Sequence, residues 1–225
     1  MNRPCVLLDL DGTLTDSRPG ILGSIHHALR ALGHTPDPTQ DLTWIIGPPL
    51  EDVVARVLAH YNDTRGPEAV AEYRRHYGEV GLYQNSVYPG IPEALAGLRA
   101  GGRDLVLATA KRTAFAIRIL EHFGLSPLFR AIYGSEGDGM LDHKPELIAH
   151  ILAREKPPAA IMVGDRSHDI VGAHANRLRA IGVAWGYGGV PELTQAGADA
   201  IAARPEDLPG LINSLSPEGE GRGAG

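Results

Sequence analysis

The sequence has 225 residues, of which 43% are hydrophobic and 21% are charged, as is typical of soluble globular proteins with one sizeable domain or a core and a smaller insert. The net charge of −6 disfavours a nucleic acid polymer as partner, because such proteins carry basic surfaces that contact phosphates. Cys5 is the only cysteine, which excludes an intrachain disulfide and favours the cytoplasm. The apolar run before Asp9 is too short for a signal peptide or a membrane span.

In chain order, the first predicted element is a buried strand over residues 5–10. Five later apolar runs have the same character, at residues 104–109, 130–133, 159–163, 180–184 and 199–202. Between the later runs lie helical patterns, at residues 112–123, 144–155 and 168–177. Strands that alternate with helices predict an α/β fold, with a Rossmann-like three-layer core around a parallel sheet whose faces are covered.

The interval between the first and second strands differs from the rest, because no strand pattern occurs from Asp16 to about Tyr88. Residues 20–33 and 49–61 each place their apolar side chains on one helical stripe. Helical sequence continues over residues 67–83. This interval is therefore predicted to be an all-helical insert.

The predicted domain organisation follows from this insert. Residues 1–15 and 89–215 form the α/β core, residues 16–88 form a helical cap, and two connecting segments between them make a hinge. The Gly-rich residues 216–225 are predicted to be a disordered tail. Internal repeats and the usual dinucleotide, P-loop, serine-hydrolase and zincin motifs do not occur in the sequence.

The polar residues with catalytic potential follow the predicted strands. Open parallel sheets bind ligands beyond the carboxyl ends of their strands, near the point where the strand order reverses. Residues that follow different strands are therefore expected to meet at one sheet edge. In chain order these residues are Asp9, Asp11, Thr109, Lys144, Asp165 and Asp169.

Four carboxylates at one edge need a cation to neutralise them. Oxygen ligands without cysteine or clustered histidine favour Mg²⁺, and Lys144, with Lys111 second, is the candidate for further neutralisation. A calcium-binding loop that begins at Asp9 fails, since Leu14 and Gly20 stand where glycine and glutamate are required. Each of these motifs alone also has a structural interpretation, such as a turn or a helix cap. Because they occur in this order and each lies near its own strand, together they favour a catalytic site.

These motifs resemble those of the haloacid dehalogenase superfamily of phosphohydrolases, over nearly the whole chain except the tail. The D-x-D-G-T motif occupies residues 9–13, the Ser/Thr of the second motif is Thr109, the lysine of the third is Lys144, and G-D-x-x-x-D occupies residues 164–169. The insert after the first motif is similar to the small helical cap of the phosphoglycolate phosphatase and β-phosphoglucomutase branch. The sequence from residue 164 onward looks like phosphoglycolate phosphatase-type and 5′-nucleotidase-type members.

The resemblance implies a reaction in two steps. Asp9 attacks phosphorus and forms an aspartyl-phosphate. Asp11 protonates the leaving group and then takes a proton from the water that hydrolyses the intermediate. Mg²⁺ is expected to be held by the Asp9 carboxylate, the Asp11 backbone carbonyl and Asp165.

The resemblance also implies groups that bind the substrate. The phosphoryl oxygens are expected to be held by Thr109, Ala110, Lys144 and Gly12. Asp169 is expected to orient Lys144 or a metal-bound water. The cap is expected to close over the site and to contact the leaving group, through residues 44–49 and the nearby residues of the cap entrance. The candidates for this contact are Arg18, His26, His27, Trp44, Ile46, Gly47 and Pro48, with packing or solvation as the alternative.

The implied function is that of a Mg²⁺-dependent phosphoric monoester hydrolase, similar to phosphoglycolate phosphatases, acting on a small phosphate ester. A β-phosphoglucomutase-like phosphotransferase and a 5′-nucleotidase-type phosphatase stay open as alternatives. A phosphonatase is disfavoured because residues 16–88 contain no lysine, and a dehalogenase because Asp11 is present. A non-enzymatic binding module is disfavoured because every motif residue is intact. Phosphoglycolate, nucleoside monophosphates, sugar phosphates and phosphotyrosine stay open as substrates, and a monomer or homodimer stays undecided.

Overall fold

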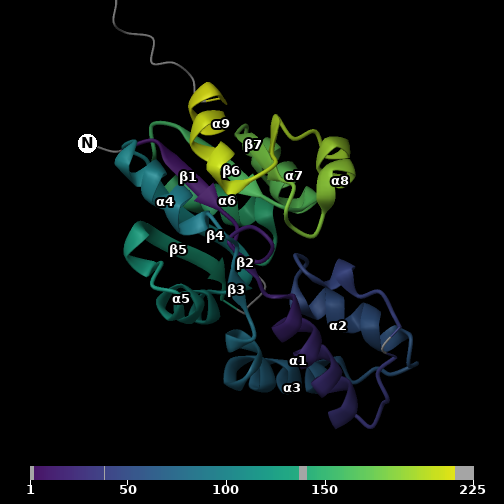
Figure 1. The fold of residues 1–225 in the computed structure, drawn as a ribbon. Coiled ribbons are helices and arrows are strands. Elements are labelled where there is room, and N and C mark those ends of the chain that lie inside the picture. Colours follow the sequence, from purple (N-terminus) through teal and green to yellow (C-terminus); the bar gives the residue numbers. More distant parts are fainter. Residues whose placement is uncertain (1–2, 38, 137–140, 216–225) are drawn as a thin grey trace, which may run out of the picture.

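A six-stranded parallel sheet forms the centre of the computed structural model, which describes residues 3–37, 39–136 and 141–215 (Figure 1). The strand order is β5-β4-β1-β6-β7-β8, and every neighbouring pair is parallel. The strands are β1 (Cys5–Leu8), β4 (Asp104–Arg112), β5 (Phe129–Ser135), β6 (Ala160–Gly164), β7 (Arg179–Val183) and β8 (Ala200–Ala202). All six predicted strands are confirmed, whereas the predicted tail, residues 216–225, lies outside the described residues.

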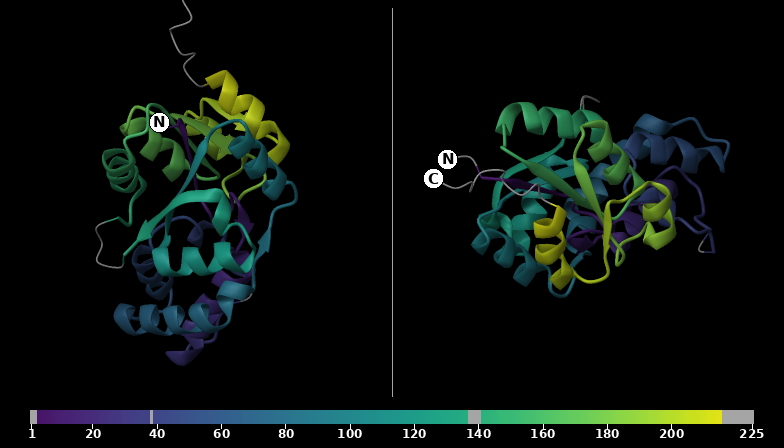
Figure 2. Two further views of the ribbon diagram at one scale, coloured as in Figure 1. Left: turned by 90° about the vertical axis from the view of Figure 1, so that its left-hand side faces the viewer. Right: turned by 90° about the horizontal axis from the view of Figure 1, so that it is seen from above.

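Helices cover both faces of the sheet, which confirms the predicted three-layer α/β fold (Figure 2). One face packs against α6 (Lys144–Glu155), α7 (Ser167–Ala175) and α8 (Gly189–Gln195). The other face packs against α4 (Ile91–Ala100), α5 (Thr113–His122) and α9 (Leu208–Leu215). Helices α5, α6 and α7 were predicted to within a few residues, and α4, α8 and α9 were not predicted.

The position of strand β1 between two covered faces of the sheet explains why all its residues are apolar. Successive side chains of a strand point to opposite faces, so Val6 and Leu8 belong to the cluster under α4, α5 and α9, whereas Cys5 and Leu7 belong to the cluster under α6 and α7. All four side chains are at most 2% exposed. A strand between two covered faces has no polar side, which is why it reads as a continuous run.

In the described part of the insert, the α-helices are α1 (Arg18–Ala31), α2 (Leu50–Ala59) and α3 (Gly66–Glu79), which gather on one side of the sheet domain (Figure 1). Their apolar stripes face one another, so that Ile25 and Leu29 of α1, Val54 of α2 and Val70 of α3 are buried together. The predicted all-helical insert is thereby confirmed. Within the described residues, no helix combines the length and the apolar character needed to cross a membrane.

Two very short strands connect the insert to the sheet domain. Strands β2 (Thr15–Asp16) and β3 (Ser86–Val87) pair antiparallel, with Thr15 opposite Val87. The expectation of no strand between Asp16 and Tyr88 was therefore wrong at both ends of that interval. A two-residue strand has no periodicity of its own and forms because its partner, far away in the sequence, lies beside it. The pair runs where the hinge was predicted, and the exact domain boundaries stay a prediction.

Candidate active site

The site lies where the carboxyl ends of three neighbouring strands meet. Strand β1 lies between β4 and β6, and this is where the chain order of the sheet changes direction, the usual place for a ligand in an open α/β sheet. Asp9 directly follows β1, and its backbone N–H donates to the carbonyl of Val163 in β6 at 3.0 Å. Thr109 lies in the last part of β4, and Asp165 follows β6. Residues far apart in sequence are thus brought to one edge.

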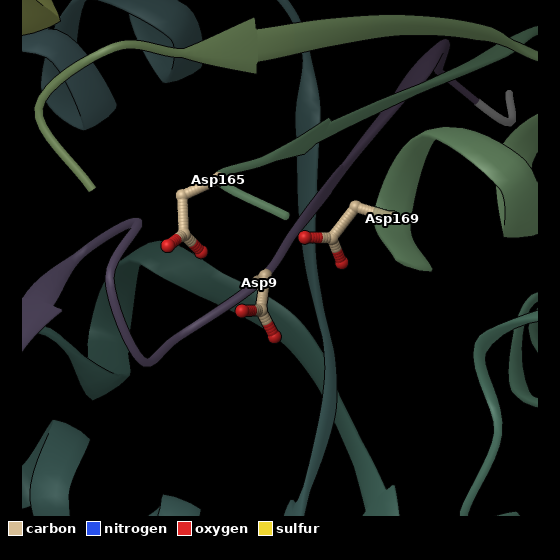
Figure 3. Close-up of side chains that lie close together, drawn as sticks. All are labelled: Asp9, Asp165 and Asp169. Atoms are coloured by element: carbon tan, nitrogen blue, oxygen red, sulfur yellow. The ribbon is translucent and has the colours of Figure 1, made fainter. Parts of the chain in front are cut away.

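Three carboxylates form a buried cluster at this edge (Figure 3). Asp9, Asp165 and Asp169 each offer an oxygen atom, and these atoms lie within 4.8 Å of one another. The residues are 5%, 0% and 1% exposed. Asp169 belongs to the first turn of α7, where it also accepts a hydrogen bond from the backbone N–H of Arg166 at 3.1 Å. The helix start therefore fixes the third carboxylate against the other two.

Lys144, at the start of α6, is the buried cation of this cluster. Its Nζ lies 2.7 Å from Asp9 Oδ1 and 2.6 Å from Asp169 Oδ1, and it donates to the carbonyl of Ala108 at 2.7 Å. Burial opposes the charge of Lys144, but the carboxylates of Asp169 and Asp9 outweigh it and raise the pKa of the ammonium group. Gly172 makes room for this lysine, because a Cβ atom there would lie 2.6 Å from Lys144 Cβ.

One ammonium does not balance three carboxylates. Burial raises the pKa of Asp9 to about 6, although the charge of Lys144 acts in the opposite direction. Burial, and then the charges of Asp9 and Asp169, raise the pKa of Asp165 well above its usual range. Asp165 receives only neutral donors in the described residues, namely the hydroxyl of Thr13 at 3.3 Å and the N–H of Tyr187 at 2.8 Å. This oxygen-rich, negatively charged set fits a hard divalent cation.

The predicted metal ligands were Asp9, Asp11 and Asp165, whereas the clustered side chains are those of Asp9, Asp165 and Asp169. The side chain of Asp11 points elsewhere: its Oδ2 lies 2.9 Å from Nζ of Lys111. Asp11 was expected to bind through its backbone carbonyl, which does not depend on the ion pair of its side chain. Lys111, which the sequence ranked only second among the lysines, therefore lies in the site, and its signal was its position two residues after Thr109.

The residues predicted to bind phosphate lie around the same point. Thr109 and Ala110 line the cleft in front of Asp9. The Thr109 hydroxyl accepts a hydrogen bond from the backbone N–H of Lys111 at 3.2 Å, so its own hydrogen stays available to a ligand. Gly12 has φ +88°, and a Cβ atom there would lie 2.2 Å from Asp165 Oδ2. The N–H of Gly12 already donates to the carbonyl of Thr15 at 2.8 Å, so Gly12 contributes close approach of the backbone rather than a free donor.

The cleft lies between the sheet edge and the insert, and the predicted specificity residues divide there into two groups. The first group lines the cleft together with Asp9 and Asp11, and it consists of Ile46, Gly47 and Pro48. The second group does not line it, and it consists of Arg18, Trp44, His26 and His27. Arg18 donates to the hydroxyl of Thr43 at 3.2 Å, the guanidinium of Arg56 lies 4.0 Å from the Trp44 ring centre, and His27 stacks on His76 with ring centres 4.3 Å apart.

Comparison with known proteins agrees with this geometry. The family profile described as haloacid dehalogenase-like hydrolase matches residues 6–183. A 5′-nucleotidase from Pseudomonas aeruginosa is 44% identical over 192 residues, which cover 84% of this chain and 86% of that protein. The tyrosine-protein kinase PtkA from Mycobacterium tuberculosis is 44% identical over 186 residues, which cover 81% of this chain but only 62% of the kinase. A phosphoglycolate phosphatase from Cupriavidus necator is 32% identical over 216 residues, which cover 93% of this chain and 94% of that protein.

The fold is also similar to that of solved proteins. A solved structure described as a predicted phosphatase from Clostridium acetobutylicum superimposes with a TM-score of 0.87 and 37% sequence identity, over 96% of this chain and 100% of that chain. The family match extends over most of the sequence, and it confirms the resemblance stated from the motifs, including relatives named phosphoglycolate phosphatase. The chain belongs to the haloacid dehalogenase-like hydrolases, and it is a phosphoric monoester hydrolase of that family.

Proposed function

We propose that this enzyme is a Mg²⁺-dependent phosphohydrolase that cleaves a small phosphate monoester through an aspartyl-phosphate on Asp9. The observation that carries the proposal is the position of the Asp9 carboxylate, which directly follows strand β1, lines the cleft and is held by Lys144 at 2.7 Å. A carboxylate is a modest nucleophile. Positioning and charge neutralisation must therefore supply most of the acceleration of phosphoryl transfer.

The proposed ligands of Mg²⁺ are the carboxylates of Asp9 and Asp165 and the backbone carbonyl of Asp11, with Asp169 beside them. Support comes from the imbalance of charge, since three buried carboxylates share the single ammonium of Lys144. When bound, the cation would supply positive charge that offsets the negative charge of the nucleophile and of the phosphoryl group. Gly12, which keeps the space beside Asp165 free of a side chain, is needed for the same arrangement.

The phosphoryl oxygens are proposed to be held by the Thr109 hydroxyl, the backbone at Ala110 and the ammonium of Lys144. Thr109 donates a directed hydrogen bond, while Lys144 acts as a point charge fixed by Asp9 and Asp169. Because Lys144 is buried and held by three acceptors, it needs little reorganisation when negative charge develops on the phosphoryl group.

Asp11 is proposed to move the proton. In the first step, an oxygen of Asp9 bonds to phosphorus while the bond between phosphorus and the ester oxygen breaks, and the ester oxygen takes a proton from the Asp11 carboxyl group. In the second step, water attacks phosphorus and gives a proton to the Asp11 carboxylate, while the oxygen of Asp9 leaves. Asp11 lines the cleft beside Asp9, so both transfers occur next to the nucleophile.

The substrate is proposed to be phosphoglycolate or a nucleoside 5′-monophosphate. The sequence motifs and the relative from Cupriavidus necator favour phosphoglycolate, whereas the 5′-nucleotidase, at higher identity, favours a nucleotide. Transfer to a sugar or protein hydroxyl is the competing activity, since the same phosphorylated Asp9 can serve it, and PtkA carries a kinase name. We expect the enzyme to act in the cytoplasm, where its single cysteine stays reduced.

The test is a panel of phosphoglycolate, AMP, glucose 6-phosphate and phosphotyrosine with Mg²⁺, read out as released phosphate. The expected result is Mg²⁺-dependent release from at least one ester, with no phosphoenzyme in Asp9→Asn. Asp11→Asn should still bind metal but turn over slowly. Equal and mild losses in both variants would contradict the assigned roles, and isomerisation of the sugar phosphate without phosphate release would show a mutase instead.

A further inference from the structure

Lys111 is a buried cation that the proposed reaction does not yet use. Its side chain is 7% exposed, and its Nζ lies 2.9 Å from Asp11 Oδ2 and donates to the hydroxyl of Tyr77 at 2.7 Å. The ammonium also lies 4.4 Å from the centre of the Tyr77 ring. A buried ammonium needs such partners, and one of the two comes from the sheet domain while the other comes from helix α3 of the insert.

Lys111 pairs with only one of the two carboxylate oxygens of Asp11, the proposed acid. Asp11 Oδ2 faces Lys111, whereas Asp11 Oδ1 is buried and has no hydrogen-bond partner in the described residues. A buried polar atom without a partner is costly and needs an explanation. Asp11 lines the cleft, so Oδ1 is the oxygen left for the group that exchanges a proton with Asp11 in the proposed reaction.

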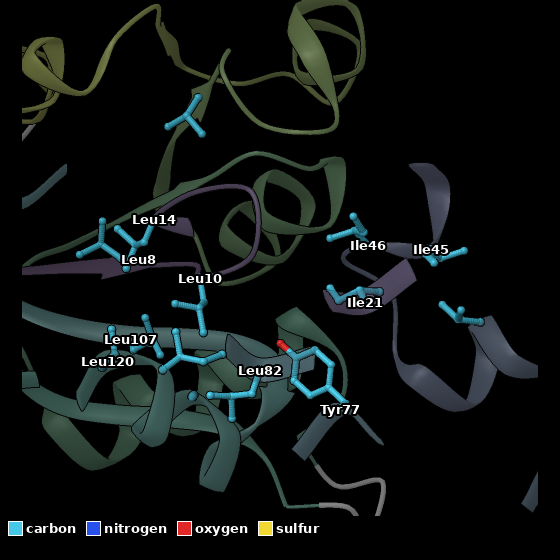
Figure 4. Packing of buried hydrophobic residues seen from close by; sticks show 14 of the residues in the cluster. Leu8, Leu10, Leu14, Ile21, Ile45, Ile46, Tyr77, Leu82, Leu107 and Leu120 are labelled. Atoms are coloured by element: carbon cyan, nitrogen blue, oxygen red, sulfur yellow. The ribbon is translucent and has the colours of Figure 1, made fainter. Parts of the chain in front are cut away.

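Tyr77 can reach Lys111 only while the insert lies against the sheet domain. The Tyr77 ring is 1% exposed and stacks on Tyr73 of the same helix at 5.5 Å. Across the boundary it meets the edge of the Phe115 ring of α5 at 5.4 Å. In Figure 4 its ring lies beside Leu82. If α3 moved away, the hydroxyl would leave with it and Lys111 would lose an acceptor.

We propose that Lys111 and Tyr77 are positioning residues for Asp11: Lys111 holds Oδ2, so that Oδ1 is the oxygen that exchanges the proton, and Tyr77 holds Lys111 there only when the cap is closed. Neither residue donates or takes a proton in the reaction. Proton transfer thereby becomes dependent on the position of the insert, since the group that aligns the acid is supplied partly by the cap. The inference rests on the proposed role of Asp11.

The test compares esters that differ in how much they need an acid. An alkyl ester, here AMP or phosphoglycolate, releases an alkoxide that must be protonated, whereas p-nitrophenyl phosphate releases a phenolate that leaves without a proton. We measure kcat/KM with Mg²⁺, because this parameter covers only the steps up to departure of the leaving group. Asp11→Asn, the reference variant, should lower kcat/KM for the alkyl ester by at least about a hundredfold and for p-nitrophenyl phosphate much less.

Lys111→Met and Tyr77→Phe should show the same selectivity. Loss of a hydrogen bond to a charged group predicts about a tenfold decrease for the alkyl ester in Tyr77→Phe and about a hundredfold decrease in Lys111→Met. Lys111→Arg, which keeps the charge, should recover part of the lost activity. Tyr77→Phe retains the buried ring, so it tests the hydroxyl even if the lysine variants fail to fold.

The matched control is Tyr83→Phe. Tyr83 belongs to the insert, and its hydroxyl accepts a hydrogen bond from Arg118 of the sheet domain at 3.1 Å, so it makes the same kind of contact across the boundary but away from Asp11. For Tyr83→Phe, the ratio of kcat/KM for the alkyl ester to kcat/KM for p-nitrophenyl phosphate should equal that of the wild type. Equal losses on both esters in Lys111→Met and Tyr77→Phe, with a selective loss in Asp11→Asn, would overturn the inference alone. An Asp11→Asn variant without selectivity would instead overturn the proposed acid, and hydrolysis of no ester would overturn the proposed function.

Discussion

Replacing Asp165 with asparagine is expected to make the metal-free enzyme more stable, although the change removes a member of the acidic cluster. Asp165 lies beside the carboxylates of Asp9 and Asp169, and the ion pairs of Lys144 in the described residues go to those two. The donors to Asp165 are a hydroxyl and a backbone N–H, both neutral. Asparagine keeps the shape and can still accept the N–H, but it carries no charge.

The magnitude follows from the spacing of the charges. Two unit charges 4.8 Å apart, the upper limit within the cluster, interact by about 3 kcal/mol at an effective dielectric constant near 20. When ionised, Asp165 faces two carboxylates and one ammonium, so about one such repulsion is not compensated at a pH above the raised pKa values of Asp9 and Asp165. With EDTA present, Asp165→Asn should therefore be more stable than the wild type by about 3 kcal/mol, which for a chain of this size is roughly 6–12 °C in Tm.

The assay is thermal unfolding followed by circular dichroism, with EDTA and with saturating Mg²⁺. The wild type should gain about 2.7 kcal/mol at a Mg²⁺ concentration of 100 Kd, and Asp165→Asn should gain much less. Asp169→Asn is the matched control: it changes charge in the same way but removes a partner of Lys144 at 2.6 Å, so it should lower stability. The reasoning is refuted if Asp165→Asn is less stable than the wild type in EDTA, or if Mg²⁺ stabilises both equally.

Three further predictions concern the same fold. Gly12→Ala should lower both stability and Mg²⁺ affinity, because its Cβ would lie 2.2 Å from Asp165 Oδ2 at a backbone φ of +88°; unfolding with and without Mg²⁺ checks this. Lys144→Met should destabilise the metal-free protein by about 3–5 kcal/mol, since it leaves buried carboxylates unpaired, and urea unfolding in EDTA would show it. Burial would raise the pKa of Asp104, but hydrogen bonds from Arg130 and Arg99 outweigh burial and lower this pKa. The contribution of Asp104 to stability is therefore present above about pH 4 and is lost as the pH falls through its folded-state pKa. In acid unfolding, the stability of Asp104→Asn should thus depend less on pH than that of the wild type below about pH 4.

The strands and the motif residues could be predicted from the sequence because their signals are local. Buried parallel strands are short apolar runs, and each of the six runs became a strand. Helix α6 begins at Lys144 and ends at Glu155, as its apolar period indicated. Since the carboxyl ends of parallel strands lie at one edge, the positions of Asp9, Thr109 and Asp165 at or near the ends of their strands were enough to place them together.

Three helices were missed because their local signals conflict with their structure. Helix α4 follows Pro89 and Gly90 and begins with Ile91 and Pro92; such residues usually mark loops, although proline is also favourable in the first turn of a helix. Helices α8 and α9 contain glycine and proline, which usually mark loops. They form because packing outweighs propensity: Leu193 and Ile212 are fully buried against the sheet.

The sequence by itself determined the class of fold, the helical insert and the identity of the charged residues at the sheet edge. Only the tertiary structure decided which charge faces which. Asp169 rather than the side chain of Asp11 completes the acidic cluster, and Lys111 lies between Asp11 and Tyr77. The physical reason is that apolar periodicity is read along the chain, whereas an ion pair depends on distances of a few ångströms between elements whose separation in sequence carries no information about their contact.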